Sequence, residues 1–299
     1  MVLLGHLLIF VTVVEQRHFS KAAKLLNLSQ PNVSLHIRNL ENELGTVLLH
    51  RSPKHVNVTE EGEILYIRAK KILSLYEEAK QEINDRKSIV QGTLKIGASF
   101  TIGEYLLPRI LADYAKKYPN VKVEVVVGNT KEVCEDIRMN QLDIGIVEGE
   151  VSDEDVNITP FMEDEMIMIA PPSHPLSQIQ MVMPEMLQDQ VWILREDGSG
   201  TRAYSDQLIR DLKLRVKHLF IFSSSQGIKE AVSAGLGIAM ISRWTVLKEL
   251  EAKELKRLNI NNRTFKRDFA IIQGKQGARS KAHQLFLKKL EHSVTMFTF

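Results

Sequence analysis

The sequence predicts an α/β protein in three parts: a small helical head, one long helix, and a larger domain of alternating strands and helices. Three observations lead to this prediction. Two short amphipathic patterns follow one another from Phe19 to Leu44, a helical pattern then runs from Thr59 to about Ile89, and strand and helix patterns alternate from Thr93 onward. The 299 residues suffice for about two domains.

Composition places the chain among ordinary globular proteins, with 44% hydrophobic and 25% charged residues and a net charge of +2. Residues 1–58 contain six Lys or Arg against three Glu, a local charge of +3. This mild basic bias is compatible with phosphate contact without requiring it. The single cysteine, Cys134, excludes an intrachain disulfide, and we expect a buried, inert thiol in a reducing cytoplasm.

The apolar start of the chain, Val2 to Val14, is expected to be a first helix that packs on the head. It lacks the basic region and the small-residue cleavage site of a signal peptide. No stretch approaches the length of a membrane span, so we expect a cytoplasmic protein without a membrane partner.

The first amphipathic pattern after this start is short. Its apolar residues fall at helical spacing, and Ser20 is the expected N-cap; they are Phe19, Ala22, Ala23 and Leu26. The two small alanines would let another helix cross closely.

The second pattern predicts the helix that would cross it. Ser29 is its expected N-cap, and Pro31 lies in the first turn, where its missing N–H does no harm. Its apolar stripe consists of Val33, Ile37, Leu40 and Leu44. Two such helices have the geometry of a helix-turn-helix, whose second helix enters the DNA major groove, although an ordinary helical hairpin has the same spacing.

The outward residues of this second helix are mostly short polar groups that can bond base edges or phosphates. A two-stranded wing is expected next, from Thr46–Leu49 and Val56–Val58, with a basic tip between them. The predicted DNA contacts from helix and wing are Ser29, Gln30, Pro31, Asn32, Ser34, His36, Arg38, Arg51 and Lys54.

These residues resemble the helix-turn-helix of LysR-type transcriptional regulators. The matching positions are Phe19-Ser20, Ala22-Ala23, Leu25 or Leu26, Ser29-Gln30-Pro31, Ser34, Leu40-Glu41, Leu44-Gly45, Leu48-Leu49 and Arg51. Leu35 departs from the pattern, because many relatives carry a long polar or basic residue there. The resemblance implies a sequence-specific regulator that binds an interrupted palindrome in double-stranded DNA and contacts RNA polymerase.

The long helix after the wing opens at Thr59, a good N-cap, and its apolar residues lie near one side: Ile64, Ile67, Leu73, Tyr76, Ala79 and Ile83. A helix of this length has little core of its own to cover that side, so a second copy of the chain is the expected partner. LysR-type relatives pair this way, and the resemblance implies a homodimer or a homotetramer.

The alternating order from Thr93 onward implies a parallel sheet with helices on both faces. The pattern predicts two lobes joined by crossings near Thr159–Glu163 and Asn262–Arg267, with a cleft between them. This arrangement resembles the periplasmic-binding-protein-like effector domain of the same family. The expected domains are residues 1–58, 59–91 and 92–299, with lobe I at 92–161 and 268–299 and lobe II at 162–267.

Ligands of such sheets bind beyond the carboxyl ends of strands, near helix N-termini. Short polar groups follow the predicted strands there, and we expect them to bind a small anion or carboxylate, although Glu148 would suit a hydroxyl or an amine better. The candidate effector-binding residues are Ser99, Thr101, Glu148, Ser199, Gly200, Thr201, Arg202 and Ser225.

The segment Gly198–Arg202 resembles the branch of the family that includes cysteine-biosynthesis, sulfite-responsive and carbon-fixation regulators. The resemblance implies a small inorganic anion or a phosphorylated metabolite as effector. We expect neither a cofactor nor a bound metal, and no catalytic constellation is found, so an enzyme is not expected. The alternative is a solute-binding protein that uses the two lobes without binding DNA.

Overall fold

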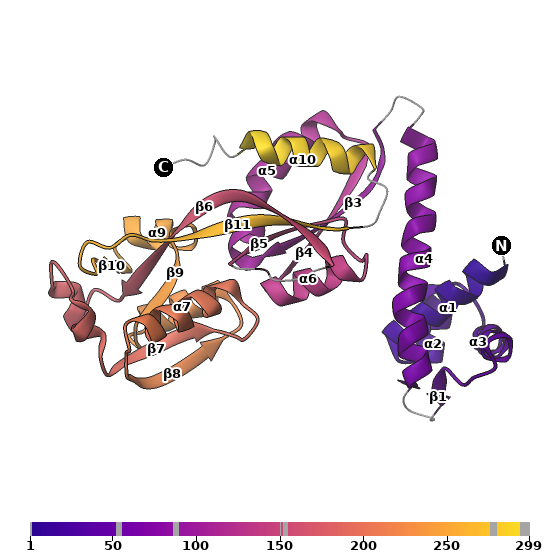
Figure 1. The fold of residues 1–299 in the computed structure, drawn as a ribbon, viewed down its shortest axis with the longest axis horizontal. Helices are drawn as coiled ribbons and strands as arrows, with labels where there is room; N and C mark the ends of the chain where they lie inside the picture. The colour runs from indigo at the N-terminus through magenta and orange to yellow at the C-terminus, as the bar shows by residue number, and fades with distance from the viewer. Residues whose placement is uncertain are drawn as a thin grey trace. The chain divides into compact units, whose positions relative to one another are not determined.

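The computed structural model describes residues 2–51, 56–85, 90–149, 151, 155–275 and 280–293. These residues fold into two compact units, the first ending with the long helix and the second comprising almost all of the following chain (Figure 1). No helix in these ranges is both long and apolar enough to cross a membrane.

The first unit is a three-helix head, a small hairpin and one long helix. In chain order its elements are α1 (Val2–Gln16), α2 (Phe19–Leu25), α3 (Gln30–Leu44), β1 (Leu49–Arg51), β2 (Val56–Val58) and α4 (Glu60–Asp85). The first wing strand therefore starts later than predicted. Residues 86–89, the predicted end of the long helix, lie outside the described ranges.

The ends of α2 and α3 show how local chemistry sets the helix boundaries. Ser29 caps α3 as predicted, since its side chain accepts a hydrogen bond from the Asn32 N–H. The prediction of Ser20 as the cap of α2 is wrong. His18 takes that position because its backbone is extended and its imidazole accepts from the Ser20 N–H, which places Ser20 inside the first turn.

The core of the head is formed by apolar side chains of α1, α2, α3 and the wing, and α4 contributes the fully buried Ala69. Burial of Val33, Ile37 and Leu40 is worth about 1.5–3 kcal/mol each. Leu44, expected to continue this stripe, is 48% exposed, because it is the last residue of α3 and the chain turns away at Gly45.

One side of α4 packs on the head, and Lys70 pairs there with Glu15 at 2.7 Å. Several large apolar residues of α4 remain exposed in this protomer, as expected for a face that needs a partner: Ile64, Ile67, Ile72, Leu75, Tyr76 and Ile83.

The second unit contains a sheet with the strand order β10-β6-β11-β5-β3-β4, and β9 pairs with β6. The four strands outside its parallel part are β6 (Val156–Ala170), β9 (Ala239–Ser242), β10 (Lys256–Leu258) and β11 (Phe265–Gly274). The predicted parallel part consists of β3 (Gly92–Ser99), β4 (Val121–Gly128) and β5 (Ile144–Glu148). The remaining strands pair antiparallel, because two long strands run back and forth between the lobes. The sheet is therefore mixed rather than parallel throughout.

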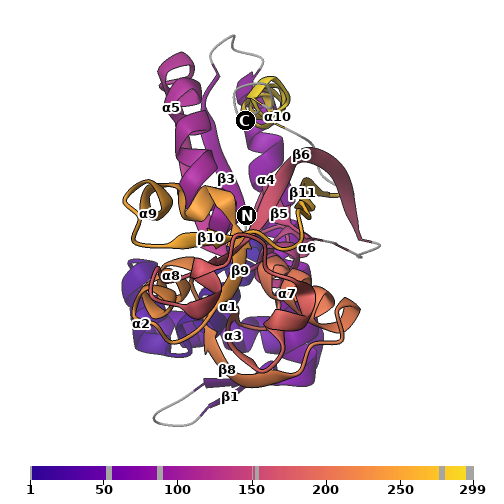
Figure 2. The ribbon, with the colours of Figure 1, turned by 90° about the vertical axis from the view of Figure 1, so that its left-hand side faces the viewer.

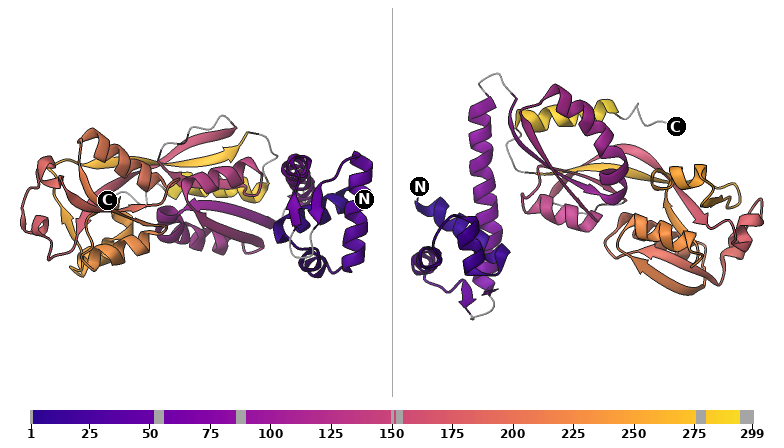
Figure 3. Two further views of the ribbon diagram at one scale, coloured as in Figure 1. Left: turned by 90° about the horizontal axis from the view of Figure 1, so that it is seen from below. Right: turned by 180° about the vertical axis from the view of Figure 1, so that it is seen from behind.

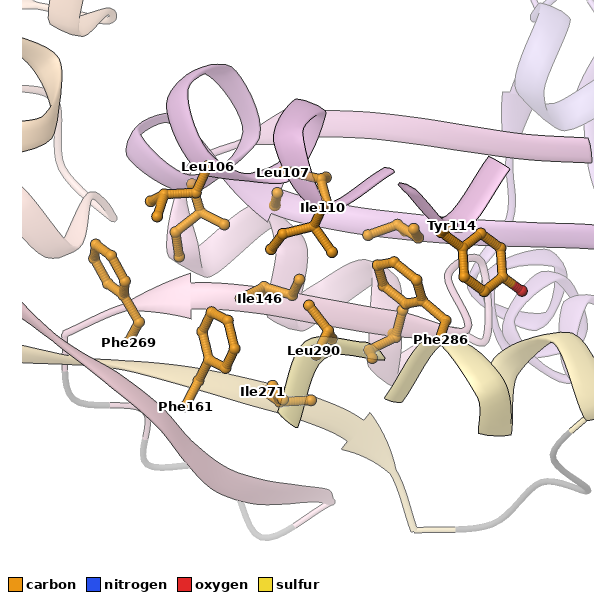
Figure 4. Close-up of a cluster of buried hydrophobic side chains, with 14 of the residues drawn as sticks. Leu106, Leu107, Ile110, Tyr114, Ile146, Phe161, Phe269, Ile271, Phe286 and Leu290 are labelled. Carbon is orange, nitrogen blue, oxygen red and sulfur yellow. The ribbon is translucent and has the colours of Figure 1, made fainter. Parts of the chain in front are cut away.

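Helices cover both faces of this part of the sheet, which is lobe I (Figure 3). A π-helical turn (Ile102–Leu106) leads into α5 (Leu107–Lys117), which packs with α10 (Lys281–Ser293) on one face. Figure 4 shows Ile110 and Tyr114 of α5 meeting Phe286 and Leu290 of α10 over the strands.

The opposite face of lobe I is covered by α6 (Thr130–Arg138). Cys134 of α6 is half-buried, not buried as expected, because it lies at the edge of this core.

The segments predicted as crossings between the lobes are parts of continuous strands. Residues Thr159–Glu163 belong to β6 (Val156–Ala170), and residues 265–267 belong to β11 (Phe265–Gly274), which pairs with β6 along its whole length (Figure 1). Backbone pairing satisfies the polar groups of both crossings, so the lobes are joined by a two-stranded ribbon instead of loops.

Lobe II repeats the layered arrangement. Its strands are β7 (Gln190–Arg195), β8 (Val216–Phe222), β9 (Ala239–Ser242) and β10 (Lys256–Leu258). The helices α7 (Gly200–Asp211) and α8 (Ser225–Ser233) pack on opposite sides of β9 (Figure 2), and a short α9 (Leu247–Glu251) follows. The patterns used above did not predict β10 or α9, which are only 3 and 5 residues long.

Gly62 offers a test of the packing between α4 and the wing. A Cβ at this position would overlap the Leu48 carbonyl oxygen and approach the Val58 side chain at 2.6 Å. We expect Gly62→Ala to destabilise the first unit by about 1–3 kcal/mol, because the obstacle is backbone. Thermal unfolding followed by circular dichroism, together with hydrogen exchange in α3, measures the effect.

The matched control is Gly5→Ala in α1, where no atom lies within 4 Å of the added methyl group. Alanine at an exposed helical position is expected to leave stability unchanged or raise it by up to about 1 kcal/mol. Equal stability of the two variants would contradict the close packing at Gly62.

Candidate functional site

The exposed face of α3 carries the predicted DNA contacts. Ser29, Gln30, Pro31, Asn32 and Arg38 are exposed, and Ser34 is half-buried. The Gln30 side-chain amide donates to the Ser34 hydroxyl at 3.3 Å, which aligns two groups that can read base edges. Leu35 lies among them with 52% exposure, so this surface also contains an apolar side chain.

The sequence analysis expected His36 on this outward face, but the structure places it only partly there, with a half-buried side chain. Its ring contacts the ring of His6 on α1, with centroids 4.9 Å apart. Its Nδ1 is buried without a hydrogen-bond partner among the described residues. The correction follows from helical geometry, because position 36 lies beside the buried Ile37, at the edge of the α1 contact.

Of the two DNA contacts predicted in the wing, only Arg51 lies within the described residues. Arg51 is the last residue of β1, and Lys54, the predicted basic tip, lies outside the described residues. The base of the wing is fixed by Thr59, whose hydroxyl donates to the Val47 carbonyl at 2.8 Å and accepts from the Gly62 N–H at 3.0 Å.

In the second unit, three of the predicted effector residues meet at a residue that the sequence analysis did not select. The buried guanidinium of Arg267 donates to the Thr201 hydroxyl at 3.0 Å, to Glu148 at 3.0 Å and to the Thr101 hydroxyl at 3.4 Å. The Thr201 hydroxyl in turn donates to Glu148 at 3.0 Å. Glu148 and Thr101 come from lobe I and Thr201 from lobe II, so this cluster joins the lobes.

Asp164 of β6 completes the cluster. Its carboxylate accepts from Arg267 Nε at 2.8 Å and from the Ser242 hydroxyl at 2.7 Å. Burial raises the pKa of Asp164, and Arg267 offsets only part of that rise. Burial lowers the pKa of Arg267, but the Glu148 and Asp164 carboxylates outweigh it, so the pKa of Arg267 lies above its ordinary value and the side chain stays charged.

The structure engages the predicted effector residue Glu148 within the protein itself. Both of its carboxylate oxygens are hydrogen-bonded within the protein, and the side chain is 2% exposed.

The two lobes approach one another closely beside this cluster. A Cβ on Gly200 would overlap the Glu148 carbonyl oxygen, so only glycine fits there. The Lys131 N–H of lobe I donates to the Gly198 carbonyl of lobe II at 3.2 Å. The structure therefore has the lobes in contact at the start of α7.

A second buried cation, Arg195, lies at the carboxyl end of β7. Its guanidinium is held by Glu196 at 2.7 Å, donates to the Ser225 hydroxyl at 3.3 Å, and stacks over the Phe100 ring of lobe I at 4.5 Å. The sequence analysis missed Arg195, although a cation directly after a buried strand could have indicated it. Arg202, which it did select, is bound to Asp206 and to the Arg195 carbonyl.

Two predicted effector residues remain with free hydrogen-bonding capacity. The hydroxyls of Ser99, at the end of β3, and Ser199, the residue before α7, are buried and have no hydrogen-bond partner among the described residues. A buried polar group without a partner is costly in a native protein and calls for an explanation, of which a bound ligand is one. Within the described residues, no cluster of three or more His, Cys, Asp or Glu side chains could hold a metal ion.

Comparison with known proteins identifies the family. Residues 4–63 match the bacterial regulatory helix-turn-helix protein, lysR family, and residues 88–294 match the LysR substrate binding domain. The chain belongs to the LysR family. It is a DNA-binding transcriptional regulator with an effector-binding domain, and its relatives are regulators and not enzymes.

Among the relatives of this LysR-family regulator, the HTH-type transcriptional regulator CysL of Bacillus subtilis is 47% identical, over 94% of each chain. A probable RuBisCO transcriptional regulator of Phaeodactylum tricornutum is 35% identical, over 97% of this chain and 98% of its own. These relatives confirm the predicted branch.

Among solved structures, the Synechocystis CcmR regulatory domain in complex with 2-PG is 29% identical with a TM-score of 0.65. The match covers 69% of this chain and 99% of that one.

Proposed function

We propose that this regulator reads its operator with the amino-terminal half of α3 and senses a small oxyanion bound between the two lobes. The observation that carries the DNA-binding part is the exposed row of short polar side chains on a helix whose other side is buried in the head. A helix fixed in this way presents side chains to base edges with little loss of conformational entropy on binding.

The proposed DNA contacts are those of the sequence analysis, with His36 placed at the edge of the surface. Ser29, Gln30, Asn32 and Ser34 supply base-edge or phosphate bonds, Pro31 fixes the first turn, and Arg38 supplies charge for the backbone. Arg51 and Lys54 of the wing are proposed to contact the adjacent phosphates.

The proposed assembly is a dimer through α4, with a tetramer formed by two dimers. Support comes from the exposed apolar residues of α4, which a second copy would cover. A dimer places two copies of α3 in successive major grooves, so the operator is an interrupted palindrome. We place the regulator in the cytoplasm, with RNA polymerase as a further partner.

We propose the domain boundaries 1–58, 59–91 and 92–299 for the head, the linker and the effector-binding domain, with the lobes divided near residues 161 and 268. Support for the division comes from the buried cores, since Phe161 and Phe269 belong to the core of lobe I while Met166 belongs to that of lobe II.

The proposed effector is a small oxyanion or carboxylate. Ser99 and Ser199 supply hydroxyl donors, and Ser199 directly precedes the N–H groups at the start of α7. Arg195, which is bonded to Ser225, supplies positive charge. The CcmR regulatory domain was solved with 2-PG, which supports a similar ligand class here.

For the operator, we expect Gln30→Ala and Ser34→Ala each to weaken specific binding by about 1–3 kcal/mol per lost base contact, because the exposed Gln30 is hydrogen-bonded to the half-buried Ser34 on the same helix face. Gel-shift titration against the promoter region of the regulator's own gene, with a scrambled sequence as competitor, measures the change.

Glu43→Gln near the other end of α3 is the matched control, since this exposed residue lies far from the amino-terminal turn. It should bind the operator at least as well as the unchanged protein, because a negative charge is removed. Undiminished binding by both alanine variants would exclude Gln30 and Ser34 from the interface.

For the effector, we expect Ser99→Ala and Ser199→Ala to weaken anion binding by about 10-fold to 100-fold, the loss of one hydrogen bond to a charged ligand. Neither change should destabilise the ligand-free protein, because each removes a buried hydroxyl that has no described partner. Isothermal titration with inorganic phosphate, sulfate and 2-PG, beside thermal unfolding, separates the two effects.

Ser233→Ala, at an exposed position near the end of α8, serves as control and should leave both quantities unchanged. If the two serine variants unfold at a lower temperature and bind the tightest of these anions as before, the hydroxyls have a structural role and the effector binds elsewhere.

A further inference from the structure

We propose that Arg267 is a positioning residue that holds the two lobes closed before any effector binds. The anion bound by its guanidinium is the Glu148 carboxylate of lobe I, which also accepts from Thr201 at the start of α7. The inference concerns regulation of the proposed effector site and rests on that proposal only for its link to the effector. The closed arrangement itself is argued from contacts within the second unit.

Arg267 lies at the point where β11 passes from one lobe to the other. Two residues before it, Phe265 pairs with Met166 and packs on the core of lobe II. Two residues after it, Phe269 is buried in the core of lobe I. The guanidinium is thus anchored to the ribbon that joins the lobes, and its bond to Asp164 ties together the two strands of that ribbon.

From this position the guanidinium reaches both lobes. It donates to Thr101 and Glu148 on one side and to Thr201 on the other. Thr201 has a single hydroxyl proton, which it gives to Glu148, so it can accept from Arg267 without conflict. A buried network in which one guanidinium meets acceptors from both lobes favours the arrangement of the groups that form it.

The buried charges of the cluster favour the closed form of the two lobes. The cluster holds one cation, Arg267, and two carboxylates, Glu148 and Asp164, all nearly inaccessible to solvent. If the lobes separated at Thr201, Glu148 would lose its bond from lobe II, and Arg267 would lose an acceptor. Each broken bond leaves a charged group less well compensated, so the closed form is favoured.

The consequence for regulation is that the effector meets a site that is already assembled. If a variant populates the closed form less, its apparent affinity for the effector falls by the closed fraction. Weakening the Arg267 cluster is therefore expected to lower anion affinity although Ser99 and Ser199 are unchanged.

One backbone amide reports directly on closure. Lys131 is the second residue of α6, where an N–H has no acceptor within its own helix. Its N–H donates instead to the Gly198 carbonyl of the other lobe at 3.2 Å. Exchange of this amide with solvent deuterium is therefore slow when the lobes touch and fast when they part.

The test uses Thr201→Val and Glu148→Gln in the full-length protein without added anion. Valine keeps the shape of threonine and removes the hydroxyl that joins the lobes, whereas glutamine removes the charge paired with Arg267. We expect the Lys131 amide to exchange at least about ten-fold faster in both variants, measured by mass spectrometry with single-residue resolution. The amides of β3 should keep their rates.

Ser205→Ala is the matched control. Ser205 is also buried on α7, but its hydroxyl donates to the Thr201 carbonyl within the same helix and does not touch the other lobe. Its Lys131 exchange should equal that of the unchanged protein. Arg267→Met is not used as the primary variant, because it leaves Glu148 and Asp164 as buried carboxylates without a cation.

An unchanged Lys131 rate in Thr201→Val and Glu148→Gln would overturn the proposal. So would an equal acceleration of the β3 amides, because the cluster would then support the stability of the whole unit and not the lobe position. A second arm titrates the same proteins with inorganic phosphate and 2-PG. If the Lys131 amide exchanges faster in the two variants and the unchanged protein binds neither anion, the role proposed for Arg267 is supported and the proposed effector site is rejected.

Discussion

The effector-binding unit depends on one constraint: two strands pass through both lobes, and a buried arginine fixes them to each other and to the ends of neighbouring elements. Because β6 and β11 pair continuously, the lobes cannot drift apart as they could on flexible loops. Arg267 and Asp164 occupy the region where this ribbon changes from one core to the other. The position of Thr201 relative to Glu148 follows from that anchoring.

In the DNA-binding unit, the polar side chains of α3 are held on a helix whose apolar side is buried. The apolar side of α3 is buried against α1 and α2, and the wing is fastened to α4 through Thr59. The contact between His6 and His36 marks the boundary of the exposed surface. The recognition proposed above therefore relies on side chains of α3 that a buried helix face holds in place.

Local patterns predicted much of this structure, and long-range contacts account for most of what they missed. The spacing of Ala22, Ala23 and Val33 was enough for the head, because its contacts are close in sequence. Ser99, Glu148 and Thr201 were selected from the rule that sites lie at strand ends, and the structure places Glu148 and Thr201 in one buried cluster. Arg267 was not, because its role depends on Asp164, 103 residues away in sequence. Without the register of β6 against β11, it resembles a charged residue in an ordinary connection.

The close approach at Gly200 has a consequence for how such regulators can diverge. A single methyl group there would overlap the Glu148 carbonyl oxygen and push the start of α7 away from lobe I. One substitution would thus lower the population of the closed form, and with it the affinity for the effector, while the residues proposed to contact the operator stayed the same.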